Sequence, residues 1–126
     1  MIPSIRTADV TGAVAFYTDK LGFEVVRSNE GNVALALGEE RLMLEAAGAF
    51  YSVGYNEAIR ARIGAVSPHA LYIEVPDVDS YHEKLQAAGV QVVDQLLPRP
   101  WGQSEFTVAD RDGNWLTFWS ATSQQP

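Results

Sequence analysis

The stretch between residues 98 and 119 holds the side chains best suited to binding a small molecule. Two runs with alternating apolar residues, 103–109 and 114–119, flank Asp110-Arg111-Asp112-Gly113, which predicts a β-hairpin with a tight turn. One face of this hairpin is apolar and suits a hydrophobic core. The other face carries two indoles, two hydroxyls and a carboxylate, from Trp115, Trp119, Thr107, Thr117 and Glu105. Aromatic surface with few polar groups is typical of the wall of a binding cavity.

Composition limits the classes of function. Among the 126 residues there is no cysteine, which excludes disulfides, thiolate nucleophiles and cysteine-ligated zinc. The net charge of −7 argues against a nucleic-acid partner and favours a neutral or cationic ligand. No apolar run approaches the length of a membrane span, and the first residues do not resemble a signal peptide. The sequence therefore predicts a cytoplasmic protein with no membrane partner.

Two helices alternate with short strands in the expected secondary structure. The helices begin at Asp9 and Asp77, whose carboxylates can cap a helix N-terminus, and end at Gly22 and Gly89. The expected strands cover residues 3–7, 23–27, 32–37, 41–46, 69–75, 90–96, 103–109 and 114–119. Residues 48–67 are irregular, and a loop of this length is either functional or partly ordered.

The two halves of the chain repeat one another. Asp9-Val10 returns as Asp77-Val78, 68 residues later, at the start of the second expected helix. Such self-similarity predicts a single α+β domain, 1–126, built from two tandem βαβββ modules at about 1–47 and 68–121. One helix covers only one face of each sheet. We therefore expect the two open faces to curve around a common cleft, with the helices outside.

Alternation along each strand assigns side chains to the cleft. On the strand at 69–75, Tyr72 and Glu74 face the cleft, and on the strand at 41–46 Glu45 does so. Arg6 joins them by analogy between the two modules, and it either meets a ligand or neutralises one of these carboxylates. The candidate ligand-binding residues are Trp101, Trp115, Glu105, Thr117, Tyr72, Glu74, Glu45, Arg6, Trp119 and Tyr51.

Each group of candidates has a structural alternative. The three indoles can instead pack against a partner subunit, because aromatic residues are enriched at interfaces. The glutamates can be solvated carboxylates at the rim, which is the usual place of glutamate. Tyr51, with Phe50 and Tyr55, either lines the mouth of the cleft or anchors the long loop.

The double repeat, the Asp-Val…Phe-Tyr…Leu-Gly-Phe run at 9–23 and Asp110-Arg111-Asp112-Gly113-Asn114 resemble the vicinal oxygen chelate superfamily. This is the fold of glyoxalase I, extradiol dioxygenases and bleomycin-resistance proteins, and the resemblance covers nearly the whole chain except 48–67. The run at 6–23 and Pro-Trp-Gly-Gln-Ser-Glu-Phe at 100–106 resemble the bleomycin-resistance branch most closely. The resemblance implies a homodimer whose modules pair across the subunit boundary.

Enzymes of this superfamily hold a metal ion with His, Gln and Glu at corresponding inward positions. The resemblance places those positions at Ile2, Glu45, Ala70 and Thr117, of which only Glu45 is a good ligand. His69 is adjacent to one of them, but alternation points it out of the cleft unless a one-residue bulge turns it inward. The sequence therefore predicts neither a metal site nor a cofactor.

Three functions follow as expectations. The first is a metal-free protein that sequesters an aromatic, cationic small molecule, as the bleomycin-resistance resemblance implies. The second is a metal-dependent glyoxalase- or dioxygenase-like enzyme that uses Glu45 and an inward His69. The third is an interaction or regulatory domain in which the cleft is vestigial. We expect no catalytic residue, because neither histidine belongs to a recognisable triad and Asp110 and Asp112 suit turn formation.

Overall fold

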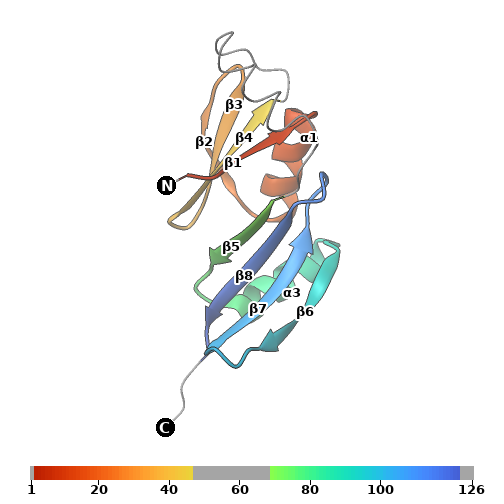
Figure 1. The fold of residues 1–126 in the computed structure, drawn as a ribbon. Coiled ribbons are helices and arrows are strands. Elements are labelled where there is room, and N and C mark those ends of the chain that lie inside the picture. Colours follow the sequence, from red (N-terminus) through yellow and green to blue (C-terminus); the bar gives the residue numbers. More distant parts are fainter. Residues whose placement is uncertain (1, 47–68, 123–126) are drawn as a thin grey trace.

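A computed structural model describes residues 2–46 and 69–122 of the chain, and Figure 1 shows two successive modules in it. The first module runs in the order β1 (Ser4–Thr7), α1 (Val10–Ala15), a π-helical continuation η1 (Phe16–Lys20), β2 (Glu24–Ser28), β3 (Asn32–Leu37) and β4 (Glu40–Ala46). The second module runs in the order β5 (Ala70–Glu74), α3 (Val78–Ala87), β6 (Val92–Pro98), β7 (Gln103–Ala109) and β8 (Trp115–Ala121).

Each module contains one four-stranded mixed sheet. The strand orders are β1-β4-β3-β2 and β5-β8-β7-β6. In both sheets the first strand of the module pairs in parallel with the last, and the other pairs are antiparallel. The predicted α+β fold of two tandem βαβββ modules is therefore confirmed. Within the described residues, no helix is long and apolar enough to cross a membrane.

Matching aspartates start the two helices, as predicted. The Asp9 carboxylate accepts a hydrogen bond from the Gly12 N–H at 3.0 Å, and the Asp77 carboxylate accepts one from the Ser80 N–H at 3.2 Å. These backbone hydrogen bonds hold the pKa of each carboxyl below its usual value. The two aspartates that repeat in the sequence therefore have the same role, since each caps the N-terminus of its helix.

The alternation of apolar residues places the core where it was expected. One cluster of buried side chains runs through both modules, so neither sheet has a core of its own. Its strand residues include Leu42, Leu44, Ile73, Phe106, Val108, Leu116 and Phe118. Among residues 2–46 and 69–122, no helix covers the opposite face of either sheet.

Several strand ends differ by one or two residues from the prediction, and two differences concern α3 and the residues that follow it. The strand expected from residue 90 begins at Val92, because Val90 belongs to the end of α3, where its N–H donates to the Leu85 carbonyl at 3.0 Å. The charged neighbours of His82, Glu83 and Lys84, predict a position at the surface, but His82 is half-buried, and its ring packs edge to face with Phe106 at 4.8 Å between ring centroids. His82 follows Val78 by four residues, so both lie on the inner face of the helix.

The turn between β7 and β8 joins the two modules. The Tyr17 hydroxyl, on η1, donates a buried hydrogen bond to Asp110 Oδ2 at 2.6 Å. Asp110 also accepts hydrogen bonds from the Asp112 N–H and from the backbone and side-chain N–H groups of Asn114. Asp110 is thus a turn former, as predicted, and it also fixes the second module against the first.

The buried Tyr17 leads to a prediction about alkaline pH. Burial, with the neighbouring Asp110 charge, raises the pKa of Tyr17 far above its usual value, and burial also raises the pKa of Tyr81. A raised folded-state pKa means that stability is fully present below about pH 10, the unfolded pKa, and is lost as the pH rises above it. We expect urea unfolding to give a falling free energy above about pH 10, with a shallower decline in Tyr17→Phe. An equal slope in both proteins would contradict this role of Tyr17.

The outer strand of each sheet is irregular. The pairing of β2 with β3 shifts register between Val25 and Arg27. The pairing of β6 with β7 shifts twice, between Val92 and Asp94 and between Asp94 and Leu97. Such bulges leave one residue out of the ladder and bend the strand. Each sheet therefore has one bent edge, at β2 or β6, whereas the strand at its other edge, β1 or β5, pairs without a shift.

Candidate functional site

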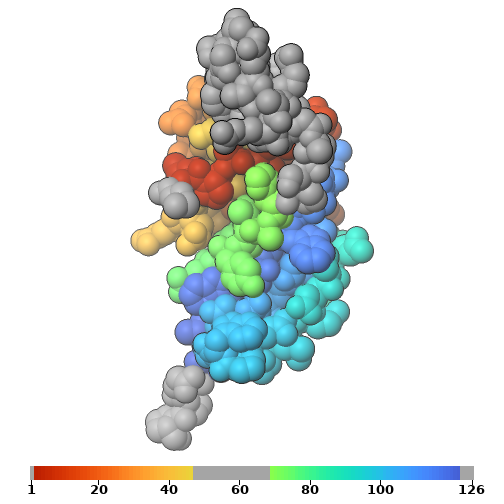
Figure 2. All heavy atoms as spheres, viewed as in Figure 1, coloured from red at the N-terminus to blue at the C-terminus, as the bar shows by residue number. Residues whose placement is uncertain are grey.

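The open face of the second sheet brings most of the predicted residues together. The strand register places them in three adjacent rows across β5, β8 and β7. These rows are Ala70, Trp115 and Ala109, then Tyr72, Thr117 and Thr107, then Glu74, Trp119 and Glu105. Figure 2 shows β5 beside β7 and β8 on one face of the molecule. The hairpin wall, as we call this face together with Trp101, is therefore a continuous surface.

Exposed aromatic rings surround a buried polar floor on the hairpin wall. Trp101 and Tyr72 are each 63% exposed and Trp115 is 53% exposed. Thr107, Thr117 and Glu105 lie on the same face but are buried. Large aromatic side chains left open to water on one face are unusual for a monomer and typical of a surface that binds something.

The two threonines of the floor hydrogen bond to each other. Their hydroxyl oxygens, on Thr107 and Thr117, lie 2.8 Å apart across β7 and β8, and either hydroxyl can donate. One hydroxyl proton is used in this pair, so the other remains available to a ligand acceptor. The pair therefore offers a single donor in the middle of the wall.

Glu105 has protein partners on both of its oxygens. Its Oε1 accepts hydrogen bonds from Trp101 Nε1 at 3.2 Å and Gln103 Nε2 at 2.9 Å. Its Oε2 lies 3.9 Å from Arg99 Nε, and Arg99 also forms an ion pair with Asp94 at 2.7 Å. Glu105 thus orients the indole of Trp101, and its charge is offset by a guanidinium before any ligand arrives.

The turn that carries Trp101 is fixed by backbone hydrogen bonds. The Gly102 N–H donates to the Arg99 carbonyl at 3.2 Å, and the Arg99 N–H donates to the Gln103 carbonyl at 2.7 Å. Pro100 fits the second position of this turn, and Gly102 has a φ of 89°, a conformation that favours glycine. The indole therefore stands on a rigid support.

Arg6 and Glu45 lie on the first sheet, as a pair. They are register partners on β1 and β4, and Arg6 Nη1 lies 4.0 Å from Glu45 Oε2. This ion pair is the contact expected in the alternative in which Arg6 neutralises a carboxylate. The structure thus divides the candidates between two sheets, and Tyr51, with Phe50 and Tyr55, lies outside the described residues.

Sequence reasoning missed two residues that hold the wall. Gln103 alternates with Glu105 on β7, so its place on the same face was readable from the sequence. Arg99 lies between two prolines in a turn, where alternation gives no direction for a side chain. Their contacts with Glu105 depend on the fold of the turn, which the residue pattern alone does not specify.

The positions at which the superfamily resemblance implies metal ligands carry unsuitable side chains. Ile2 and Ala70 have no donor atoms, Thr117 is hydrogen bonded to its neighbour, and Glu45 faces a guanidinium. The register of β5 with β8 runs without a shift, so no bulge turns His69 inward. Across residues 2–46 and 69–122, no three His, Asp or Glu side chains are grouped so that they could hold a metal ion.

Comparison with known proteins identifies the family. Residues 3–118 match the model of the Glyoxalase/Bleomycin resistance protein/Dioxygenase superfamily. A bleomycin resistance protein of Geobacillus stearothermophilus is 27% identical over 122 residues, which cover 93% of this chain and 92% of the relative.

Solved structures with the same fold include TioX from Micromonospora sp. ML1, with 23% identity and a TM-score of 0.77 over 99% of this chain and 98% of that one. Another is the bleomycin-binding protein of Streptomyces verticillus complexed with copper(II)-bleomycin, with 24% identity and a TM-score of 0.66 over 98% and 95%. These two likenesses concern the fold. By the match of its sequence from residue 3 to residue 118, the chain belongs to the Glyoxalase/Bleomycin resistance protein/Dioxygenase superfamily.

Proposed function

We propose that this protein binds and sequesters a flat, aromatic, cationic compound of the bleomycin type without transforming it. The observation that carries the proposal is the hairpin wall, where Trp101, Trp115 and Tyr72 are exposed around a buried polar floor. Curated relatives along nearly the whole chain are bleomycin resistance proteins. A wall of this kind suits a planar ligand that stacks on indole faces and makes few directional contacts.

The charges on the wall give a revised role to the carboxylates. Alternation along the strands places Glu45, Glu74 and Glu105 on faces that are expected to open to the cleft. Glu105 lies beside Arg99 and Glu45 lies beside Arg6, so these two are better suited to orient neighbouring groups than to offset a ligand cation. Glu74 is exposed in the row of Trp119, and we propose that it meets the positive charge of the ligand.

We propose that the complete cleft forms in a homodimer. The open face of one module would meet the open face of the other module from the partner, which brings Arg6 and Glu45 of one subunit opposite the hairpin wall of the other. Light scattering at micromolar concentration should give twice the chain mass of 13.8 kDa. A stable monomer that binds ligand would contradict the shared cleft and leave the fold unaffected.

We propose that the protein holds no metal ion of its own, because only one of the four implied positions carries a carboxylate. Elemental analysis after purification without chelator should find no stoichiometric zinc, iron, nickel or manganese. Chelator should leave the melting temperature unchanged. A tightly bound equivalent of any of these metals would refute the proposal. A metal that enters as part of the ligand is a different case, since the Streptomyces verticillus protein is complexed with copper(II)-bleomycin.

Calorimetric titration with bleomycin tests the function directly. We expect saturable binding of metal-free bleomycin and of copper(II)-bleomycin, with one ligand for each chain. Mass spectrometry after prolonged incubation should recover the ligand unchanged, because the proposed mechanism is stoichiometric. Absence of saturable binding would refute the bleomycin proposal, and chemical conversion of the ligand would place this protein with the enzymes of the superfamily.

A further inference from the structure

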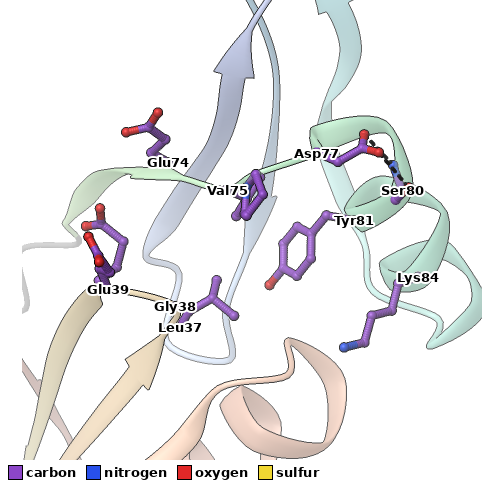
Figure 3. A pocket seen from close by; sticks show the side chains of 11 residues that line it. Leu37, Gly38, Glu39, Glu74, Val75, Asp77, Ser80, Tyr81 and Lys84 are labelled. Carbon is purple, nitrogen blue, oxygen red and sulfur yellow. Dashed lines mark hydrogen bonds between the residues drawn. The ribbon is translucent and has the colours of Figure 1, made fainter.

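A cavity of about 740 Å³ lies where the two modules meet. It is formed by the turn between β3 and β4, the end of β5 and the start of α3, and Figure 3 shows it from close by. Leu37, Val75 and Tyr81 give it an apolar interior. The Tyr81 ring is fixed there because its hydroxyl donates a hydrogen bond to the Leu21 carbonyl. None of the exposed rings of the hairpin wall lines this cavity.

The internal repeat explains why this cavity is open. At the corresponding corner of the molecule, the turn at 110–114 packs against the first helix, and Arg111 Nη2 lies 3.3 Å from Asp9 Oδ2. Asp77 is the repeat counterpart of Asp9, but the turn opposite it consists only of Gly38 and Glu39. Because this turn is shorter than the one at 110–114, it leaves a space next to α3 that its counterpart fills with protein.

The two corners also differ in charge. Gly12 leaves room for the Arg111 guanidinium, since an added Cβ there would lie 1.6 Å from Nη1. The counterpart of Gly12 is Ser80, whose hydroxyl donates to Asp77 Oδ2 at 2.9 Å. In place of an arginine, this corner carries two carboxylates, Glu39 in the shorter turn and Glu40 at the start of β4. The closed corner thus contains an internal cation, whereas the open corner faces its cavity with carboxylates.

The charges around the cavity are unevenly placed. Glu39 and Glu74 lie on one side in Figure 3, and Lys84, from the last turn of α3, lies on the opposite side. Four carboxylates and one ammonium line the cavity, so its potential is negative on balance. Lys84 disfavours a cation at its own end, which leaves the glutamate side as the place for a positive group.

We propose that this cavity is a second ligand site, which binds small aliphatic primary amines as their ammonium ions. The alkyl chain packs on Leu37, Val75 and Tyr81, and the ammonium group lies at the side of Glu39 and Glu40. Burying the alkyl chain supplies affinity, and the carboxylates select a cation over a neutral or anionic compound of the same length. This site shares Glu74 with the edge of the hairpin wall but contains none of its exposed aromatic rings, and it does not depend on the bleomycin proposal.

Amide NMR titrations of the whole protein with n-hexylamine, n-hexanol and hexanoate test the proposal. We expect n-hexylamine to give saturable shifts at Gly38, Glu39, Val75 and Asp77. n-Hexanol should bind the same residues about threefold to tenfold more weakly, because it lacks the charge. Hexanoate should not bind, and added salt should weaken only the amine. Absence of saturable shifts at these residues with n-hexylamine would overturn the proposal.

Matched variants separate charge from shape. Glu39→Gln combined with Glu40→Gln keeps the size of the side chains, and it should weaken n-hexylamine binding by about threefold to tenfold while leaving n-hexanol unchanged. Ser80→Phe should fill the cavity and remove the binding of both compounds. If Ser80→Phe does not fold, the paired glutamine variant decides alone, and equal amine affinity in that variant overturns the proposal.

Trp101→Ala is the control that locates the amine. It should leave n-hexylamine binding unchanged, because Trp101 does not line this cavity. Loss of amine binding in Trp101→Ala would move the amine to the hairpin wall and overturn the second site. If bleomycin does not bind but n-hexylamine still gives saturable amide shifts at the cavity, the proposed function is refuted and the second site is supported.

Discussion

Trp101→Ala should weaken bleomycin binding by about tenfold to a hundredfold, since stacking of a flat base on an aromatic platform is worth roughly 1–3 kcal/mol. The melting temperature of the free protein should hardly change, because the Trp101 indole is mostly exposed and packs little against the core. The turn backbone and Glu105 hold the indole in place before the ligand arrives, so its stacking energy is not spent on ordering the ring. Calorimetric titration of the unsubstituted protein and of Trp101→Ala with bleomycin measures the difference in affinity.

Phe106→Ala is the contrasting variant for the same hairpin. Phe106 neighbours Glu105 on β7 but points to the opposite face, where it is fully buried. Its truncation should lower the free energy of unfolding by about 3–5 kcal/mol through loss of burial and formation of a cavity. Trp101→Ala with unchanged affinity, and with a melting temperature reduced as far as in Phe106→Ala, would show that the indole is structural and does not bind ligand.

Asp110→Ala should have the largest effect on stability among the polar residues of the fold. It removes the acceptor for the buried Tyr17 hydroxyl and for both N–H groups of Asn114. A buried donor left without an acceptor costs about 1–3 kcal/mol, and we expect a total loss of about 3–5 kcal/mol because the groups belong to one network. Urea unfolding at neutral pH measures this loss.

Asp112→Ala is the matched control for Asp110. Asp112 lies in the same turn, but it contacts Asp110 through its backbone N–H, which donates a hydrogen bond to the Asp110 carboxylate. An alanine at this position keeps that N–H. We expect its substitution to change the free energy of unfolding by less than about 0.5 kcal/mol. Similar losses in the two variants would mean that the turn as a whole, and not the acceptor network of Asp110, stabilises the contact between the modules.

The fold was predictable from the sequence because its signals are strongly periodic. The strands at 32–37 and 103–109 have the predicted bounds, and both helices start at the predicted aspartate caps. The start of β6 was wrong because Val90 is apolar in either state, and the hydrogen bond that assigns it to the helix end is not visible in the residue pattern. Periodicity predicts well which face of a helix or strand is buried, but it predicts poorly where the element begins and ends.

The candidate site was predictable only in part. Alternation placed Tyr72, Thr117 and Trp115 on one face, because that face follows from strand register alone. The ion pair of Glu105 with Arg99 depends on how a proline-rich turn folds. The cavity next to α3 depends on how two modules pack and on the unequal length of two turns. These are long-range features, and a local pattern does not contain them.

The bent outer strands β2 and β6 restrict how copies of this chain can assemble. A flat edge strand is a template on which another chain adds its own strand, and repeated addition leads to open-ended aggregates. Here the register shifts interrupt both edges, and β6 ends at Pro98, which has no N–H to donate. Growth of either sheet through its outer edge is therefore disfavoured.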